Sequence, residues 1–469
     1  MSIRPLILSG LIIFLLSGCL INSSSSNDPP GRDSGFEVDR QQAYSHYCMA
    51  VYLEYHGDIK AALKEYREVL KLDPDSFDAR MKIGAILLGQ SNLEESIELL
   101  TTARELKPDS YRAAFLLATA CYKAGREDKA LEGYREAIRL SPDERSPYLI
   151  MASIYVQRED YAAAVLIYLD AVRQAPDQAN IWFKLGLLYI KQENLSSAIE
   201  MFRKVLELAP ESLEAHLALA SAYDLHDDDE LAIKEYELAR EISPENGNIY
   251  RRLGVLYFTT FRIKESIDAF LRLLELEPDS SNIYFLLGTA YLNNHNYPQA
   301  IEAYRKSLEL GTENDLTHFN LGAAYERNGN VDEAIRQFEE TIEINPRNAE
   351  AYNYLGYMYA EQGIKLDEAL ELVKRALELE PENGAFLDSL GWIYYQMGMT
   401  DQAVVALERA ISIISDDPTG HDHLGDAYAR QGDTSQAIGE WKKALVLGSK
   451  EPEKIREKIK IAETNIKAN

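Results

Sequence analysis

The sequence predicts an all-α protein, a solenoid of about twelve helix–turn–helix repeats closed by a C-terminal helix. Three observations support this fold class. Prolines recur every 34 residues from Pro74 to Pro278, and Pro346 continues the series after Thr312 takes one place. Between the prolines, apolar residues fall into two stripes with helical spacing. Short polar residues and glycines stand where helices of this length would begin and end.

The stretch from Asn180 to Pro210 shows the pattern of one repeat. Trp182, Leu185, Gly186 and Tyr189 lie at i, i+3, i+4 and i+7, so they share one helix face. After a polar break, a second helix carries the stripe Ala198, Phe202 and Val205. Proline cannot continue a helix, so the second helix ends before the proline. Helices this short are marginal alone, and the repeats must share stability along the array.

The spacing W-x2-L-G-x2-Y, followed by alanine, phenylalanine and proline, resembles the tetratricopeptide repeat (TPR) family. The resemblance implies a right-handed superhelix whose first helices line a concave groove. It covers residues 39–451, with repeats that begin near Ala43, Phe77, Tyr111, Arg145, Ala179, Leu213, Gly247, Ser281, Asp315, Ala349, Ala385 and Pro418. One extra residue near Gly363 delays the next proline to Pro381, in a turn where an insertion leaves helix packing intact.

Helix start and stop signals accompany this period. Nine of the eleven junctions between repeats hold a short polar residue that can cap the next helix, and Glu144 and Gln178 are the exceptions. Six turns inside repeats hold a glycine that can end the first helix: Gly57, Gly125, Gly329, Gly363, Gly398 and Gly432. The first helix is predicted to begin near Asp39. Residues 452–469 have one apolar face and predict a capping helix, or alternatively an exposed helix that binds a partner.

The first 38 residues are predicted to lie outside the repeats. The apolar run 6–16 is typical of a signal peptide and too short to anchor the protein in a bilayer. The motif L-S-G-C that ends at Cys19 resembles a bacterial lipobox, which implies removal of residues 1–18 and acylation of this cysteine. Leu20, where an inner-membrane retention signal would place aspartate, favours an outer-membrane lipoprotein facing the periplasm. An ordinary secretory signal is the alternative. Residues 19–38 would include a flexible tether.

Composition and motifs argue against several functions. Lys+Arg number 49 against 76 Asp+Glu, and this net charge of −27 disfavours nucleic acid, whose phosphates need a basic surface. No motif for a nucleophile, metal or nucleotide is present, so we expect no catalytic site, cofactor or metal. The acidic run 226–230 lacks the spacing of a calcium loop, and His421 and His423 would diverge on a helix. Cys48 and Cys121, a whole repeat apart, are expected to be free thiols.

The TPR resemblance places the fifth and ninth positions of each repeat in the groove. The fifth positions are Tyr47, Met81, Phe115, Leu149, Phe183, Leu217, Arg251, Phe285, Phe319, Asn353, Asp388 and Asp422, and the last ninth positions are Tyr357, Trp392 and Asp426. Most of the first nine fifth positions are large and apolar. They either contact a bound protein segment or pack inside the wall of the array. The acidic and aromatic residues of the last repeats either bind a Lys- or Arg-bearing partner or bond locally.

The resemblance therefore implies a protein-binding scaffold or assembly factor held by a lipid anchor in the bacterial envelope. Its groove would bind segments of partner proteins. Pilus or secretin assembly, polysaccharide export and adaptors for cell-wall enzymes all remain open as pathways. The alternative is a polysaccharide-binding lipoprotein of an export or cell-wall system, in which aromatic and carboxylate side chains hold the polymer.

Overall fold

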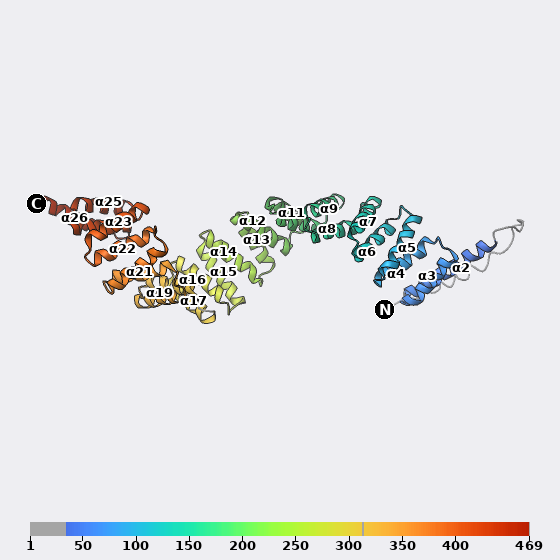
Figure 1. Ribbon diagram of the computed structural model, residues 1–469, viewed down its shortest axis with the longest axis horizontal. Coiled ribbons are helices and arrows are strands. Elements are labelled where there is room, and N and C mark those ends of the chain that lie inside the picture. The colour runs from blue at the N-terminus through green and yellow to red at the C-terminus, as the bar shows by residue number, and fades with distance from the viewer. Residues whose placement is uncertain (1–33, 312–313, 469) are drawn as a thin grey trace. The chain divides into compact units, whose positions relative to one another are not determined.

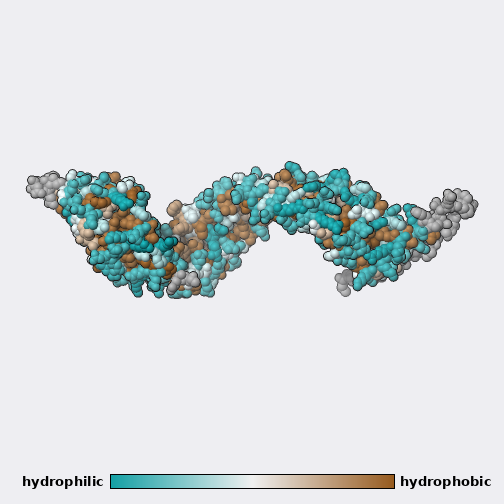
Figure 2. All heavy atoms as spheres, in the orientation of Figure 1, coloured by the Kyte–Doolittle hydropathy of each residue, from teal (hydrophilic) through white to brown (hydrophobic). Residues whose placement is uncertain are grey.

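The computed structural model describes residues 34–311 and 314–468. Within these ranges it contains 25 helices and no strand, which confirms the predicted all-α class (Figure 1). The chain divides into two compact units, residues 1–208 and 209–469, and each is described by itself. On the face shown in Figure 2, hydrophilic side chains surround smaller apolar patches. In neither described range does a helix combine the length and apolar character needed to cross a membrane.

The described part of the first unit consists of five helix pairs. The two helices of each pair pack together, and each second helix packs on the next first helix. Its helices are α2 (Ser34–Tyr55), α3 (Ile59–Leu72), α4 (Phe77–Gly89), α5 (Leu93–Leu106), α6 (Tyr111–Lys123), α7 (Glu127–Leu140), α8 (Ser146–Gln157), α9 (Tyr161–Gln174), α10 (Ala179–Lys191) and α11 (Leu195–Leu208).

The second unit repeats this arrangement in seven pairs and ends in a single helix, α26 (Pro452–Ala468). Ile455 and Ile459 of α26 are buried against the last pair, as the capping-helix prediction requires. The paired helices are α12 (Leu213–Leu225), α13 (Asp229–Ile242), α14 (Gly247–Thr259), α15 (Ile263–Leu276), α16 (Ser281–Asn293), α17 (Tyr297–Leu310), α18 (Asp315–Arg327), α19 (Val331–Ile344), α20 (Ala349–Glu361), α21 (Leu366–Leu379), α22 (Gly384–Gln396), α23 (Thr400–Ile413), α24 (Pro418–Gln431) and α25 (Thr434–Val446).

The predicted start of the first helix was wrong. Helix α2 begins at Ser34, so Asp39 lies inside the helix and does not cap it. Serine also favours a helix N-terminus, and no proline interrupts residues 35–38, so the helix can extend upstream. The last five residues of the predicted tether, 34–38, therefore belong to α2. Cys19 and the signal peptide predicted for residues 1–18 lie outside the described residues.

Seven of the twelve repeats carry the Leu-Gly pair of the motif on the first helix, and its glycine has a packing role. A Cβ added at Gly186 would lie 2.4 Å from the ring of Phe202, and one added at Gly254 would lie 2.4 Å from the ring of Phe270. Both rings are buried. Glycine on the first helix thus lets a bulky side chain of the second helix come within contact of the helix backbone. This close approach explains why the motif pairs Gly with Phe sixteen residues later.

One turn position has a positive φ in all twelve repeats. The six predicted turn glycines occupy it, with φ between 65° and 95°. The other six repeats place non-glycine residues there with φ of 58–61°: Ser91, Glu159, Glu193, Asp227, Phe261 and His295. Their left-handed conformation was not predicted, because these residues rarely adopt it. The turn geometry of the repeat therefore imposes this conformation whatever the residue.

Candidate functional site

The apolar fifth-position residues lie on the first helices and are half-buried, except Met81, which is buried. Five of them contact an aromatic residue of the second helix in the same repeat, with ring centroids 5.5–5.9 Å apart: Tyr47 with Tyr66, Phe115 with Tyr134, Phe183 with Phe202, Phe285 with Tyr304, and Phe319 with Phe338. Leu149 and Leu217 are half-buried at the same position. Each side chain therefore packs partly inside the wall of the array and is partly exposed. Packing inside the wall is thus shown for part of each side chain, and contact with a bound segment stays a prediction.

Arg251 is the charged member of this row. Its guanidinium donates a hydrogen bond of 2.7 Å to Oε2 of Glu277, at the end of α15. The arginine thus has an ionic partner within the chain. Its position among apolar side chains is consistent with packing along its aliphatic stem.

Sequence reasoning missed two exposed apolar residues on the same helices. Leu187 on α10 and Val255 on α14 occupy ninth positions, one turn after Phe183 and Arg251, and are 45% and 40% exposed. Their ninth position places them on the same helix face as Tyr357, Trp392 and Asp426 of the last repeats, but their exposure depends on the neighbouring repeats. We name Phe115, Leu149, Phe183 and Leu187 the groove face of the first unit, and Leu217, Val255, Phe285 and Phe319 the groove face of the second.

Asp388 and His423 form a buried ion pair between α22 and α24. Nδ1 of His423 lies 3.0 Å from Oδ2 of Asp388. Burial alone would lower the pKa of His423, but the carboxylates of Asp388, Asp422 and Glu361 together outweigh burial, and the pKa is raised. The indole of Trp392 stacks against the imidazole at 4.2 Å and against the ring of Tyr395 at 4.9 Å. Two rings therefore already occupy positions over the indole.

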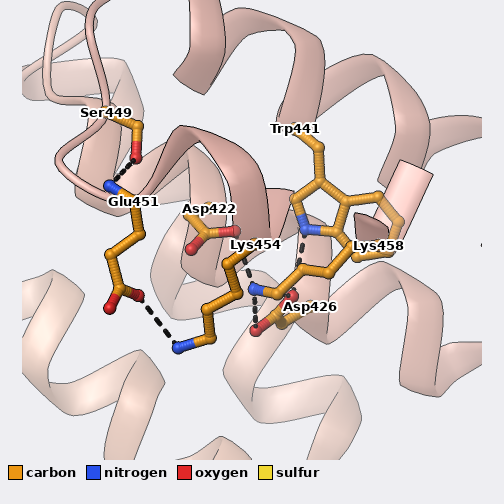
Figure 3. Close-up of polar contacts among 7 residues, drawn as sticks. All are labelled: Asp422, Asp426, Trp441, Ser449, Glu451, Lys454 and Lys458. Atoms are coloured by element: carbon orange, nitrogen blue, oxygen red, sulfur yellow. Dashed lines mark hydrogen bonds and ion pairs between the residues drawn. The ribbon is translucent and has the colours of Figure 1, made fainter. Parts of the chain in front are cut away.

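Asp422 and Asp426 on α24 share a cation from the C-terminal helix (Figure 3). Nζ of Lys458 lies 2.9 Å from Oδ1 of Asp422 and 2.7 Å from Oδ1 of Asp426. The indole N–H of Trp441 also donates to Asp426, at 3.0 Å. Burial raises the pKa of Asp426, although Lys458 opposes that shift. The cationic group predicted to come from a partner is thus supplied by α26, and all three aspartates of this section bond within the chain.

The histidines predicted to diverge contact different partners. Nδ1 of His421 lies 2.6 Å from Oε2 of Glu440, whereas His423 pairs with Asp388. In the described ranges, no three acidic, histidine or cysteine side chains gather as a metal site would require. Cys48 is half-buried and Cys121 is buried, and both are free thiols.

Helix pairs of constant length, a 34-residue period and a left-handed turn residue in each pair define a helical repeat protein. Models of the tetratricopeptide repeat match segments that together span most of the array: residues 49–110, 83–145, 151–212, 183–247, 248–280, 279–347, 338–371 and 391–432. The chain belongs to the tetratricopeptide repeat family. It is accordingly a protein-interaction scaffold, of a fold that is typically non-catalytic.

Several solved structures are similar to the chain. That of Naa15/Naa10 bound to HypK-THB is 20% identical, with 86% of this chain and 68% of that chain covered and a TM-score of 0.44. Yeast Tom70 is 20% identical over 91% of this chain and 96% of its own, with a TM-score of 0.36. MamA is 28% identical over 35% of this chain and 95% of its own, with a TM-score of 0.34. A comparison with curated proteins gave no match.

Proposed function

We propose that the chain is a lipid-anchored scaffold of the bacterial envelope that binds segments of partner proteins on its groove faces. The observation that carries the proposal is the exposure of Leu187 and Val255 beside half-buried apolar side chains on first helices. The exposed part of each of these two side chains does not contribute to the core. Exposed apolar residues at helical spacing are the anchors that bound peptide segments use.

Binding is tested by affinity purification after crosslinking in native envelopes. The test variant combines Leu187→Ser and Val255→Ser. The matched control combines Leu166→Ser on α9 and Val405→Ser on α23, which are 64% and 66% exposed on second helices. We expect the test variant to lose defined proteins that the control retains, with both variants equally helical by circular dichroism. Identical protein sets from the two variants would show that the groove faces do not bind the partners.

The lipid anchor rests on the lipobox that ends at Cys19. Two or more acyl chains on one cysteine suffice to hold a protein on a membrane. Cys19→Ala is expected to abolish incorporation of labelled palmitate and to release the protein from the outer-membrane fraction. Cys48→Ala is the control and should keep both the label and the membrane location. If Cys19→Ala still incorporated labelled palmitate, the proposed lipid anchor at this cysteine would be wrong.

The alternative ligand, a polysaccharide, would need exposed aromatic rings beside free carboxylates. In the last repeats the Trp392 indole is stacked between other side chains, and Asp422 and Asp426 are paired with Lys458. This part of the surface therefore gives no support to a glycan ligand. Competition between a peptide and the polysaccharide for the purified protein separates the two ligands.

A further inference from the structure

Phe261 is the most exposed large apolar side chain in the described part of the molecule, at 89%. It lies at the tip of the turn between α14 and α15. This turn is on the edge of the repeat and is distinct from the groove face of the second unit, whose residues lie on the first helices. The ring therefore belongs to neither the core nor the groove.

The backbone at this position does not favour phenylalanine. Phe261 has a φ of 60°, a left-handed conformation that bulky residues rarely adopt. At the same turn position the other eleven repeats hold glycine or a polar residue, and glycine carries no steric penalty there. A bulky apolar residue in a strained and exposed position, with no packing role, points to a contact outside the chain.

The base of this turn is rigidly held. The guanidinium of Arg262 lies 4.5 Å from the ring centroid of Tyr257 and donates to Glu265 at 3.1 Å. The Tyr257 hydroxyl in turn donates to Glu237 of the preceding repeat at 2.6 Å. The backbone N–H groups of Phe261 and Arg262 also donate to the backbone carbonyls of Phe258 and Tyr257, so the backbone of the turn is hydrogen-bonded and a partner that binds the ring need not order the loop.

The neighbouring turn supplies negative charge. Arg262 lies 3.8 Å from Glu230, which places the tip beside the acidic run Asp227–Glu230. Leu225 and Leu231 flank this run and are 61% and 40% exposed. The two neighbouring turns therefore present an exposed aromatic ring, two exposed leucines and a run of carboxylates, of which Asp228 lies 2.9 Å from His226 and Glu230 faces Arg262.

We propose that Phe261 is an anchor residue that inserts into an apolar pocket of a partner protein, and that Lys or Arg side chains on the rim of this pocket meet the acidic turn. The carboxylates oppose insertion into an anionic bilayer. A second copy of the chain would bring a further charge of −27. A protein with a basic rim is the occupant that fits both the ring and its charged surroundings. This contact is independent of the groove faces.

The test replaces Phe261, or Glu193 as control, with the photo-crosslinking residue p-benzoylphenylalanine in the full chain in its own host. Glu193 has the same turn position in another repeat, with a φ of 58°. We expect ultraviolet light to give one protein adduct from position 261 and none from position 193. The adduct partner is then identified by mass spectrometry, purified and titrated calorimetrically against the wild-type chain.

Phe261→Gly is expected to weaken this binding at least tenfold, whereas Glu193→Gly leaves it unchanged. Because glycine relieves the strained backbone, neither variant should melt below the wild type, which separates lost binding from lost folding. Asp227→Lys should weaken binding by slowing association. No adduct at position 261, an adduct with a second copy of the chain, or unchanged affinity of Phe261→Gly would each overturn the proposal. So would Phe261-dependent flotation on vesicles of phosphatidylethanolamine and phosphatidylglycerol.

Discussion

Replacing Gly425 with alanine is expected to destabilise the last helix pair. The added Cβ would lie 2.5 Å from Cδ1 and from Nε1 of the Trp441 indole. The indole is buried and its N–H is bonded to Asp426, so it cannot retreat freely. Overpacking of this kind costs about 1–3 kcal/mol, and the better helix propensity of alanine returns up to ~1 kcal/mol. So close a contact favours the upper part of the range, and the net loss is about 1–2 kcal/mol.

Gly439 provides a matched control in the same repeat. A Cβ added there meets no atom within 4 Å, so Gly439→Ala should stabilise α25 by about 0.5–1 kcal/mol through helix propensity alone. Native-state hydrogen exchange of α24 and α25 measures both changes locally. Gly425→Ala should reduce protection about 5- to 30-fold, and Gly439→Ala should increase it. If both substitutions increased protection, the close approach of Trp441 to the helix would not limit packing, and the reasoning would fail.

Two further predictions concern charged groups. Lys458→Met leaves two partly buried carboxylates without their cation and should destabilise α26 by about 1–3 kcal/mol, seen as lost hydrogen-exchange protection. Lys442 is exposed, so Lys442→Met should change stability by less than about 0.5 kcal/mol. If Lys458→Met and Lys442→Met destabilised the protein equally, the ion pairs of Lys458 with Asp422 and Asp426 would have no structural role. The pKa of His423 is raised in the folded state, so the protonated imidazole paired with Asp388 stabilises the fold. This contribution is fully present below the unfolded-state pKa of about 6.5 and is lost as the pH rises through the folded-state pKa. His423→Gln should therefore flatten the fall of the melting temperature above pH ~6.5, and an unchanged pH profile would contradict this assignment.

The fold was predictable because the same physical constraints recur in each repeat. Proline follows nine of the twelve second helices, and a glycine such as Gly186 makes room for the facing ring, so both residues recur with the period of the repeat. The left-handed turn was predictable where it holds glycine and missed where it holds a residue such as Glu193. At such positions the geometry of the helix pair outweighs a local preference of about 1 kcal/mol. The start of α2 was also missed, since Ser34 and Asp39 are both acceptable first residues.

The candidate site was only partly predictable. Position within the repeat identifies which side chains lie on first helices, but not what each one contacts. Asp422 and Lys458 are 36 residues apart, and their ion pair depends on how α26 is seated on the last repeat. Such a contact between different segments has no local sequence signal. The exposure of Leu187 likewise depends on which side chains of the neighbouring repeats cover it, and these leave it 45% exposed.

In each unit, helices pack mainly on those adjacent to them in sequence or next but one. A pulling force would therefore meet a series of similar small barriers instead of one large barrier. Each 34-residue repeat that unravels would add about 110–120 Å of contour length while the other repeats keep their structure. A scaffold built in this way can lengthen in steps under load and still retain partners bound to the remaining repeats.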